Sequence, residues 1–470
     1  MKEMTKGRPF SLIALFALPL LFGNLLQQMY NLMDAAIVGR YLGANALASV
    51  GATTSVQFLV FGFCIGCCVG FCVPVAQRFG AQDLPGMRRY IFNGILLTIL
   101  IASVATVVCL LSTSGILRIL HTPEGIWGNT YIYIFIIFAG IPFTLLYNFS
   151  AGLLRAVGDS RTPFIFLVIS SVLNILLDLF CICTLHLGCA GAAIATVLSQ
   201  AVSGILCTIT ILLKYDILHF QKDEMKPDAA LEKQLLLMGL PMGMQFSITA
   251  IGSMVLQAAN NGLGSIYISA LTAVSRIKGF SMCPFDAIAT ATSTFCSQNF
   301  GAGQYRRVRD GFKIGLEISV VYGLIIGLCL ILFGRTSCLI FLPADETRIL
   351  DAAAKALFIS GFFYWILGIL NVSRLTVQGL GFSGRTVISG VLEMCARSFV
   401  AIILVPVIGY NAICMADQAA WTLGGIYSLI TALVILRRIA PLSGAAANTS
   451  APRSSRHLFH PHHTHGHYSA

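Results

Sequence analysis

Charged residues are unusually scarce in this sequence. Only 10% of its 470 residues are Asp, Glu, Lys or Arg, whereas 57% are hydrophobic and the mean hydropathy is +0.83. Soluble globular domains contain about 25% charged residues, so the composition excludes a soluble protein and indicates a membrane protein. The longest polar connection between apolar stretches, residues 214–233, is too short for a soluble catalytic domain.

Sequence patterns typical of ATP hydrolysis and of membrane enzymes are also missing. No GxxxxGK phosphate-binding loop is present. Six of the nine histidines lie within 457–470, and the other three, His121, His186 and His219, are isolated along the chain. A catalytic site in a membrane needs several such side chains close together. We therefore expect neither an enzyme nor a cofactor.

Long hydrophobic runs fill most of the chain instead. A transmembrane helix needs about 20 predominantly apolar residues to cross roughly 30 Å of hydrocarbon. Stretches of sufficient length lie at 10–34, 47–76, 90–111, 128–154, 162–183, 189–213, 235–260, 267–298, 313–334, 350–373, 386–407 and 417–436. The sequence therefore predicts an all-α membrane protein with twelve transmembrane helices.

The distribution of Lys and Arg predicts how these spans are oriented. Loops on the cytoplasmic side of a membrane are enriched in both residues. With the N-terminus inside, the cytoplasmic segments contain 21 of them, whereas the outer loops contain only Arg40, Arg118, Arg335 and Arg348. We therefore expect both termini on the cytoplasmic side of a bacterial cytoplasmic membrane. The net charge of +11 then reflects this asymmetry rather than nucleic-acid binding.

The two halves of the chain resemble each other weakly. ALPLLF at 17 matches GLPMGM at 239, QRFGAQ at 77 matches QNFGAG at 298, and AVGDSRT at 156 matches GLGFSGRT at 379. The offset stays between 221 and 224, which indicates one internal repeat of six spans. We expect two pseudo-symmetric six-helix bundles, 1–213 and 234–440, joined by a cytoplasmic linker at 214–233. Residues 441–470 have the composition of a disordered, His-rich cytoplasmic tail.

Four polar residues of three predicted spans lie at a similar depth near the outer boundary. Asn174 and Asp178 are one helical turn apart and share a face, and Asp34 and Thr196 lie at comparable distances from the outer ends of their spans. A carboxylate inside a membrane costs about 2.5–3.5 kcal/mol, so such acids are usually paired or functional. Two carboxylates, an amide and a hydroxyl suit a hard cation, or a proton shared between the acids. Interhelical hydrogen bonding alone is the alternative.

The second half contains no matching pair of acids. Near the equivalent positions it offers Glu393 and Arg397, one turn apart, and we expect them to form an intramembrane ion pair that braces the bundle. Asp417 lies near the end of its span and is expected to be solvated. Coupling to a cation should therefore be confined to the first half.

Polar residues elsewhere in the first-half spans are candidates for the lining of a substrate cavity. They are Gln27, Tyr30, Asn31, Tyr133 and Asn148. Aromatic rings combined with amides suit bulky amphipathic cations, and each cation–π contact contributes about 1 kcal/mol. Packing between helices explains each of these residues equally well.

Asp286 is an acid in the span at 267–298. Arg276 and Lys278 precede it by ten and eight positions. An ion pair across the helix turns would explain it, and so would an acid that faces the cavity and attracts cationic substrates. We therefore include Asp286 among the candidate cavity residues.

Two further features concern the shape and packing of the helices. Pro19 deprives the first span of a backbone hydrogen bond and predicts a kink there. The cluster CIGCCVGFC at 64–72 imitates the spacing of metal ligands. On an uninterrupted apolar helix it is better explained as a one-sided row of small residues for close helix packing, so we expect no metal site.

The sequence resembles the multidrug and toxic compound extrusion (MATE) family, prokaryotic type, over residues 10–438. The similarity rests on the two groups of six spans, LP and QQMYNLMDAAIVGRYLG in the first span and its loop, the paired Q-x-F-G-A motifs, GDSRTP before the fifth span and GCAGAAIATVLSQ in the sixth. Family members with a cation site in the first bundle carry Asp, Asn, Asp and Thr at positions matching Asp34, Asn174, Asp178 and Thr196.

This resemblance implies that the two bundles form a V, and it also implies that the protein is a transporter. We expect a monomeric antiporter in the lipid bilayer that exports amphipathic, often cationic drugs or toxic compounds in exchange for Na⁺ or H⁺. The alternative is a flippase for a lipid-linked precursor, as in related two-bundle transporters. A flippase would need a larger, strongly cationic cavity and fourteen spans.

Overall fold

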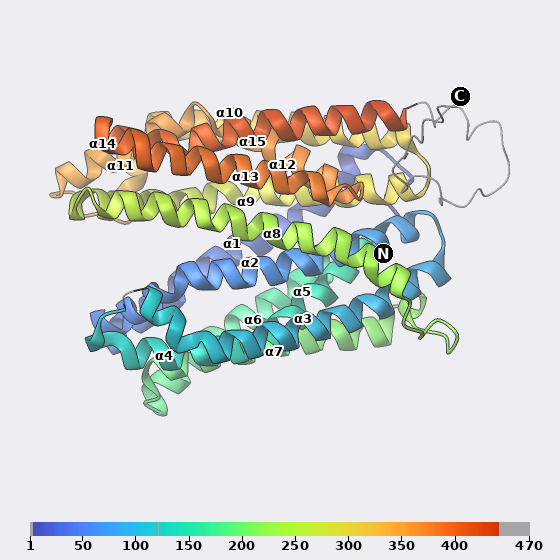
Figure 1. Ribbon diagram of the computed structural model, residues 1–470, viewed down its shortest axis with the longest axis horizontal. Helices are drawn as coiled ribbons and strands as arrows, with labels where there is room; N and C mark the ends of the chain where they lie inside the picture. The colour runs from blue at the N-terminus through green and yellow to red at the C-terminus, as the bar shows by residue number, and fades with distance from the viewer. Residues whose placement is uncertain (1–2, 121, 441–470) are drawn as a thin grey trace, which may run out of the picture.

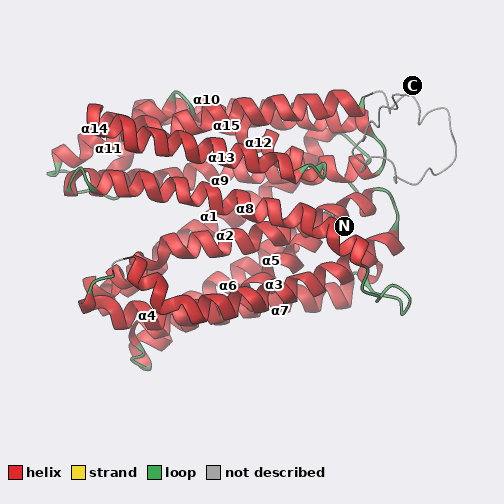
Figure 2. Cartoon of the chain, viewed as in Figure 1, coloured by secondary structure: helices red, strands yellow, loops and turns green. Residues whose placement is uncertain are grey.

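The computed structural model describes residues 3–120 and 122–440, and these form helices without any strand (Figure 2). The first half contains α1 (Pro9–Leu42), α2 (Ala44–Gly80), α3 (Leu84–Ile119), α4 (Glu124–Ala139), α5 (Ile141–Ala156), α6 (Arg161–Leu179) with the π-helix η1 (Phe180–Thr184), and α7 (Gly188–Lys214). The short 3-10 helix η2 (Asp216–Leu218) follows. The second half contains α8 (Ala229–Asn261), α9 (Ser265–Gly301), α10 (Tyr305–Cys338), α11 (Thr347–Gly361), α12 (Tyr364–Gly379), α13 (Ser383–Phe399) with the π-helix η3 (Val400–Leu404), α14 (Val405–Ile408) and α15 (Tyr410–Ile439). The predicted tail, 441–470, lies outside the described residues.

The helices form two groups, one from each half of the chain, and the groups face each other through α1 and α2 on one side and α8 and α9 on the other (Figure 1). The start of α1 and the ends of α2, α9 and α15 lie together. We call this end of the molecule the terminal end. The opposite end, where α2 and α9 begin, is called the far end.

Local sequence signals set several helix boundaries, and the repeat reproduces one of them, a glycine between the first two helices of each half. Asp83 caps α3 by accepting a hydrogen bond from the Gly86 N–H at 3.0 Å, and Asp228 caps α8 in the same way. Gly43 between α1 and α2 has a φ of +85°, and Gly264 between α8 and α9 has a φ of +107°. Glycine adopts such angles without strain, so both halves can turn sharply between their first two helices.

Eleven of the twelve predicted spans are supported by length and apolarity within the described residues. Nine single helices qualify, and the bent pairs α4–α5 and α11–α12, with bends of 43° and 56°, supply two more. The remaining helix, α9, has 37 residues but does not meet the same criterion, because its sequence is more polar. It packs against α1, α2, α10, α11 and α12, so it needs no continuous lipid-facing surface.

The internal repeat also appears in the irregularities of the fold. The bent pair α4–α5 corresponds to the bent pair α11–α12. The π-helix η1 extends α6, and η3 extends the equivalent helix α13. Sequence similarity between the halves is weak, but the two halves share even these deviations from regular helix geometry.

The halves close on each other at the terminal end through a reciprocal pair of hydrogen bonds. Gln77, in the last turn of α2, donates from Nε2 to the carbonyl oxygen of Gly379 at 3.0 Å. Gln298, in the last turn of α9, donates to the carbonyl oxygen of Ala156 at 2.8 Å. Each donor belongs to a Q-x-F-G-A motif, and each acceptor ends the bent span of the opposite half. We call these two bonds the glutamine latch.

Glycines allow the two motifs to approach closely. A Cβ atom added to Gly80 would lie 1.9 Å from the carbonyl oxygen of Gln298, and one added to Gly301 would lie 1.8 Å from that of Gln77. Both distances are far shorter than a van der Waals contact. Similar contacts continue along α2 and α8, where Gly70 faces Gly239 and Gly66 faces Gly243.

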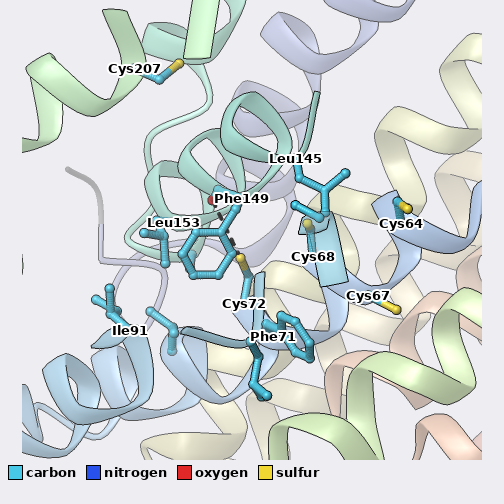
Figure 3. Packing of buried hydrophobic residues seen from close by; sticks show 14 of the residues in the cluster. Cys64, Cys67, Cys68, Phe71, Cys72, Ile91, Leu145, Phe149, Leu153 and Cys207 are labelled. Atoms are coloured by element: carbon cyan, nitrogen blue, oxygen red, sulfur yellow. Dashed lines mark hydrogen bonds between the residues drawn. The ribbon is translucent and has the colours of Figure 1, made fainter. Parts of the chain in front are cut away.

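The cysteine cluster of α2 packs against two neighbouring helices (Figure 3). Cys67 contacts Gly243 of α8, whereas Cys72 contacts Gly152 of α5 and lies 3.9 Å from the carbonyl oxygen of Phe149. The cluster therefore serves close packing, and the helix face that carries it touches both α8 and α5. Among the described residues, no group of three or more His, Cys, Asp or Glu side chains is arranged to hold a metal ion.

The linker between the halves is attached to the first half. Arg88 on α3 donates to the carbonyl oxygen of Ile217 at 2.9 Å and forms an ion pair with Glu224 at 3.2 Å. The Glu224 side chain is 2% exposed, so this ion pair is buried.

Helix α1 contacts both halves of the molecule. Near the terminal end, residues 12–17 pack in a hydrophobic cluster with α9, α10, α12 and α15 of the second half. Near the far end, Ile37 and Val38 pack with α4 and α7 of the first half. Pro19 follows the first contact region, yet α1 continues through it as one helix, so the predicted kink does not break the helix.

The closure at the terminal end predicts that Gly80→Ala destabilises the protein. The added methyl group overlaps the Gln298 carbonyl, so the two motifs must separate, at a cost of about 1–3 kcal/mol. The thermal midpoint of the purified protein in detergent should fall. Gly51→Ala is the matched control, because Gly51 lies in the same helix with nothing within 4 Å of the added atom. Equal midpoints for the two variants would contradict the prediction.

Candidate functional site

Two acids from different helices meet toward the far end of the first half. Asp34 lies on α1, and Asp178 lies in the last turn of α6. Their carboxyl groups are within hydrogen-bonding reach of each other. Asp178 is fully buried and Asp34 is half-buried. Two carboxylates this close require a shared proton or a cation to offset their repulsion.

Asn174, Thr196 and Tyr30 connect the acids to α7 and α1. With the amide nitrogen of Asn174 turned toward the acid, it donates to Asp178 Oδ2 at 3.1 Å, and the amide oxygen accepts from the Thr196 N–H at 3.3 Å. The hydroxyl of Tyr30 donates to Thr196 Oγ1 at 3.4 Å. The structure thus brings the four predicted residues together, and it adds Tyr30, which the sequence assigned to the cavity.

Each acid keeps one oxygen that is available for a ligand. Within the described part of the chain, Asp34 Oδ1 and Asp178 Oδ1 are buried without a hydrogen-bond partner. Buried polar atoms are nearly always satisfied in proteins. These two oxygens, with the neighbouring amide and hydroxyl groups, form a donor set of the kind that hard cations prefer. A proton held between the carboxyls is the other chemically reasonable occupant.

The other predicted cavity residues of the first half divide into exposed and buried groups. Gln27 and Asn31 are exposed on α1. Asn148 is half-buried, and its amide donates to the Thr144 carbonyl of its own helix at 2.8 Å. Tyr133 is only 4% exposed and packs in a hydrophobic cluster with Ile37 and its neighbours, so it does not line an accessible surface here. Its placement in the cavity is therefore corrected.

The halves separate toward the far end. At mid-length the two halves still touch, since Phe246 of α8 lies against Gly62 of α2 and Ser247 donates to the Leu59 carbonyl at 3.2 Å. Seven and eleven residues further along α8, on the same face, Ser253 and Gln257 are exposed. The surface of α8 that touches α2 in the middle of the molecule is thus accessible and polar nearer the far end. We use the term inner face for the surfaces of α1, α8 and α9 that are turned toward the opposite half near the far end.

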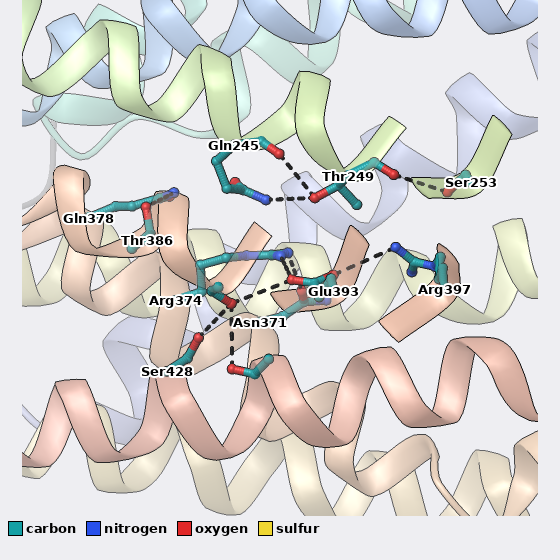
Figure 4. A network of polar contacts seen from close by, with 12 residues as sticks. Gln245, Thr249, Ser253, Asn371, Arg374, Gln378, Thr386, Glu393, Arg397 and Ser428 are labelled. Atoms are coloured by element: carbon teal, nitrogen blue, oxygen red, sulfur yellow. Dashed lines mark hydrogen bonds and ion pairs between the residues drawn. The ribbon is translucent and has the colours of Figure 1, made fainter. Parts of the chain in front are cut away.

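A buried network of charged and polar groups crosses the second half (Figure 4). Arg374 of α12 donates to Glu393 of α13 at 2.9 Å and to the Asn371 amide oxygen at 2.8 Å. The Asn371 amide nitrogen in turn donates to Asp286 of α9 at 3.4 Å. The predicted Glu393–Arg397 pair is present but long, at 4.0 Å. The main partner of Glu393 is therefore Arg374, which sequence reasoning missed.

The network continues through Asp417 back to α9. Asp417 of α15 accepts from Arg397 at 3.0 Å and from Lys278 at 2.9 Å. Its side chain is only 26% exposed, so the expectation that it is solvated was wrong. Lys278 also lies over the ring of Trp421. Because Lys278 pairs with Asp417, the ion pair that the sequence offered between Lys278 and Asp286 does not form.

The two helical groups meet near one end and expose polar inner surfaces toward the other. This arrangement is typical of a membrane transporter. The MatE family model matches residues 19–180 and 241–407, one match in each half. Similar relatives from Bacillus subtilis are the probable multidrug resistance protein YpnP, 32% identical over 65% of this chain and 68% of its own length, and the probable multidrug resistance protein YoeA, 28% identical over 81% and 83%. A solved MOP superfamily transporter from Pyrococcus furiosus has a TM-score of 0.87 at 22% identity, covering 93% of this chain and 98% of its own.

The chain belongs to the MATE family of membrane transporters. Its fold class, its helical membrane-spanning architecture and its assignment as a transporter rather than an enzyme agree with the sequence prediction. The first match ends at residue 180 and the second begins at 241, so the matched residues include Asp34, Asn174 and Asp178, whereas Thr196 of α7 lies between the two matches.

The buried network predicts that Glu393→Gln lowers stability. The substitution leaves Arg374 and Arg397 with an excess of buried positive charge, and breaking a buried ion pair costs about 3 kcal/mol. The thermal midpoint in detergent should fall clearly. Glu317→Gln is the control, because Glu317 is 59% exposed and its ion pair with Lys313 lies on the surface. A midpoint for Glu393→Gln as high as for Glu317→Gln would show that the network does not stabilise the fold.

Proposed function

We propose that this chain is a secondary active exporter of amphipathic, drug-like compounds that exchanges them for Na⁺ or H⁺. The observation that carries the proposal is the meeting of Asp34 and Asp178 from α1 and α6, with one buried oxygen of each left without a partner. The names of the Bacillus relatives support drug export. Asp34, Asn174, Asp178 and Thr196 hold the coupling cation, and Tyr30 orients the Thr196 hydroxyl.

A cation gradient supplies enough free energy for this task. One monovalent cation that moves down a potential of about 150 mV releases roughly 3.5 kcal/mol. At about 1.4 kcal/mol per factor of ten, that energy supports a substrate gradient of roughly 300-fold. ATP is not needed. The oxygen-rich donor set accepts Na⁺ and H⁺ alike, so imposed gradients of each cation are the way to distinguish them.

The membrane orientation of the proposed exporter follows from the loop charges. The excess of Lys and Arg at the terminal end supports an orientation with both chain ends in the cytoplasm, in which the inner face opens outward. We propose that the protein acts as a monomer in the bacterial cytoplasmic membrane. Substrate binds between the inner faces, where Gln27 and Asn31 of α1 and Asp286 of α9 are exposed.

Helix α1 is the proposed link between cation and substrate. It carries Asp34, and its residues 12–17 are packed on the second half. A cation at the acid pair changes the preferred packing of α1 around Pro19, where one backbone hydrogen bond is already absent. Coupling requires that the cation and the substrate favour different arrangements of α1.

Asp178→Asn should abolish gradient-driven transport while the protein still folds. The amide keeps the shape and hydrogen-bonding capacity of the side chain but removes the negative charge that a cation requires. The measurement is efflux of ethidium from proteoliposomes under an imposed Na⁺ or pH gradient. The rate for the variant should drop to that of protein-free liposomes.

Glu317→Gln serves as the matched control for this experiment. It also removes one carboxylate, but at an exposed position on α10. It should transport like the unmodified protein. Full gradient-driven efflux by Asp178→Asn would refute the assignment of the cation site. Absence of efflux of both ethidium and a zwitterionic fluoroquinolone from the unmodified protein under both gradients would refute the exporter itself.

A further inference from the structure

Helix α9 exposes polar and charged side chains and no large hydrophobic one. Its exposed residues are Ser265, Thr272, Ser275, Arg276 and Asp286. The neighbouring helix α10, by contrast, exposes a row of large apolar residues that includes Leu324, Leu328 and Leu332. A lipid-facing surface must be apolar. The exposed side of α9 therefore does not face lipid.

The exposed side of α9 faces the first half. A Cβ atom added to Gly279 would lie 3.3 Å from Gln28 Oε1, so this side of α9 meets α1. Thr272 and Arg276 lie seven and three residues before Gly279, and Asp286 lies seven residues after it, which places all of them on the side of α9 that includes Gly279. Arg276 and Asp286 are therefore charges of the inner face.

These two charges form no ion pair, unlike the basic side chains of the buried network. Lys278, Arg374 and Arg397 are each bonded to an acid within the buried network. Arg276 forms no ion pair or hydrogen bond with any described residue, and its side chain is exposed. Asp286 accepts a bond from Asn371 and is exposed as well. The inner face of α9 thus offers a guanidinium without a partner and an exposed carboxylate that is bonded only to an uncharged amide. The two groups are about 15 Å apart along the helix axis at 1.5 Å per residue.

A free guanidinium on this face works against a substrate whose only charge is positive. It repels compact cations and binds carboxylates through paired hydrogen bonds, and low-dielectric walls strengthen both effects. The carboxylate of Asp286 attracts cations and repels other carboxylates. A molecule that carries an anionic group at one end and a cationic group at the other satisfies both, and the exposed amides of Gln27 and Asn31 on α1 add uncharged hydrogen-bonding groups.

We propose that Arg276 selects substrates that bear a carboxylate, so that the preferred substrates are zwitterionic amphiphiles rather than simple cations. The carboxylate binds Arg276 toward the far end, and the cationic part lies toward Asp286. This inference rests on the proposed exporter function and narrows its substrate class. Arg276 is a specificity residue in this scheme and takes no part in holding the coupling cation.

The test uses two dyes that differ only at the group in question. Rhodamine 110 carries a free carboxylate beside its cationic ring system, and rhodamine 123 is its methyl ester and a plain cation. Dissociation constants for the purified protein are measured by fluorescence anisotropy. The unmodified protein should bind the free acid more tightly than the ester. Arg276→Gln should weaken binding of the acid about tenfold, the factor that one charge-assisted hydrogen bond supplies, and leave the ester unchanged or slightly tighter.

Two further variants separate charge at this position from charge in general. Arg276→Lys keeps the charge but not the paired geometry, so the preference for the acid should be retained in part. Arg335→Gln removes a cation from the outer part of α10, where Arg335 pairs with Asp351, and should leave the ratio of the two constants unchanged. Arg276 has no partner among the described residues, so its replacement should not lower the thermal midpoint.

The outcomes distinguish the substrate class from the exporter function. The inference is overturned if Arg276→Gln has the same ratio of acid to ester binding as the unmodified protein, if the unmodified protein prefers the ester, or if it binds neither dye. If binding depends on Arg276 as expected but neither dye is moved by a Na⁺ or pH gradient in proteoliposomes, the substrate assignment stands and the exporter function fails.

Discussion

The contact between the ends of α2 and α9 is the constraint on which the arrangement of the two halves depends. Two glutamines donate across the interface to carbonyl groups at the ends of α5 and α12, and two glycines remove the side chains that would hold the motifs apart. The contact is reciprocal because the same motif occurs once in each half. Each acceptor is the last residue of a bent span, so the bends of α4–α5 and α11–α12 help to position the two carbonyl groups at the interface.

The latch also explains how the start of the chain is positioned. Gln298 uses both atoms of its amide, because its nitrogen donates to Ala156 and its oxygen accepts from the N–H of Met4 at 3.0 Å. Met4 is 1% exposed, and its carbonyl oxygen accepts from Asn299 and Arg307. Met4 is thus fixed at the junction of the halves. α1 leaves this junction on the second half and reaches the acid pair in the first half, so a change in the packing of α1 affects both places.

Much of this fold could be predicted from sequence because its signals are local or repeated. Apolar runs of about 20 residues identify the spans, and the paired motifs reveal the repeat. The acid cluster was predictable because the spacing of Asn174 and Asp178 fixes their common face, while distance from the span ends fixes the depth of Asp34 and Thr196. Depth along the membrane can be read from sequence in this way.

Other features depend on how each helix is rotated about its axis and on which helices are neighbours. Arg374 and Asp417 could not be identified as partners of Glu393 and Arg397, because they lie on separate neighbouring spans and meet only through the rotation and packing of those helices. Tyr133 was placed in the cavity for the same reason, since its polarity is visible in the sequence and its burial is not. The structure was also needed to distinguish Arg276 from Lys278: Lys278 pairs with Asp417, whereas Arg276 has no partner among the described residues.

The central claim is that a cation at Asp34 and Asp178 changes the packing of α1, which contacts both halves, and thereby their separation at the far end. The most direct test is the distance between spin labels at Ala48 of α2 and Ser265 of α9, measured by pulsed electron resonance after the exposed cysteines Cys329 and Cys395 are replaced by serine. Addition of Na⁺ or a change of pH should shift the distance distribution of the labelled protein, and the same treatment should leave Asp178→Asn unshifted. A distribution that responds to neither cation, or a variant that responds as fully as the unmodified protein, would contradict the claim.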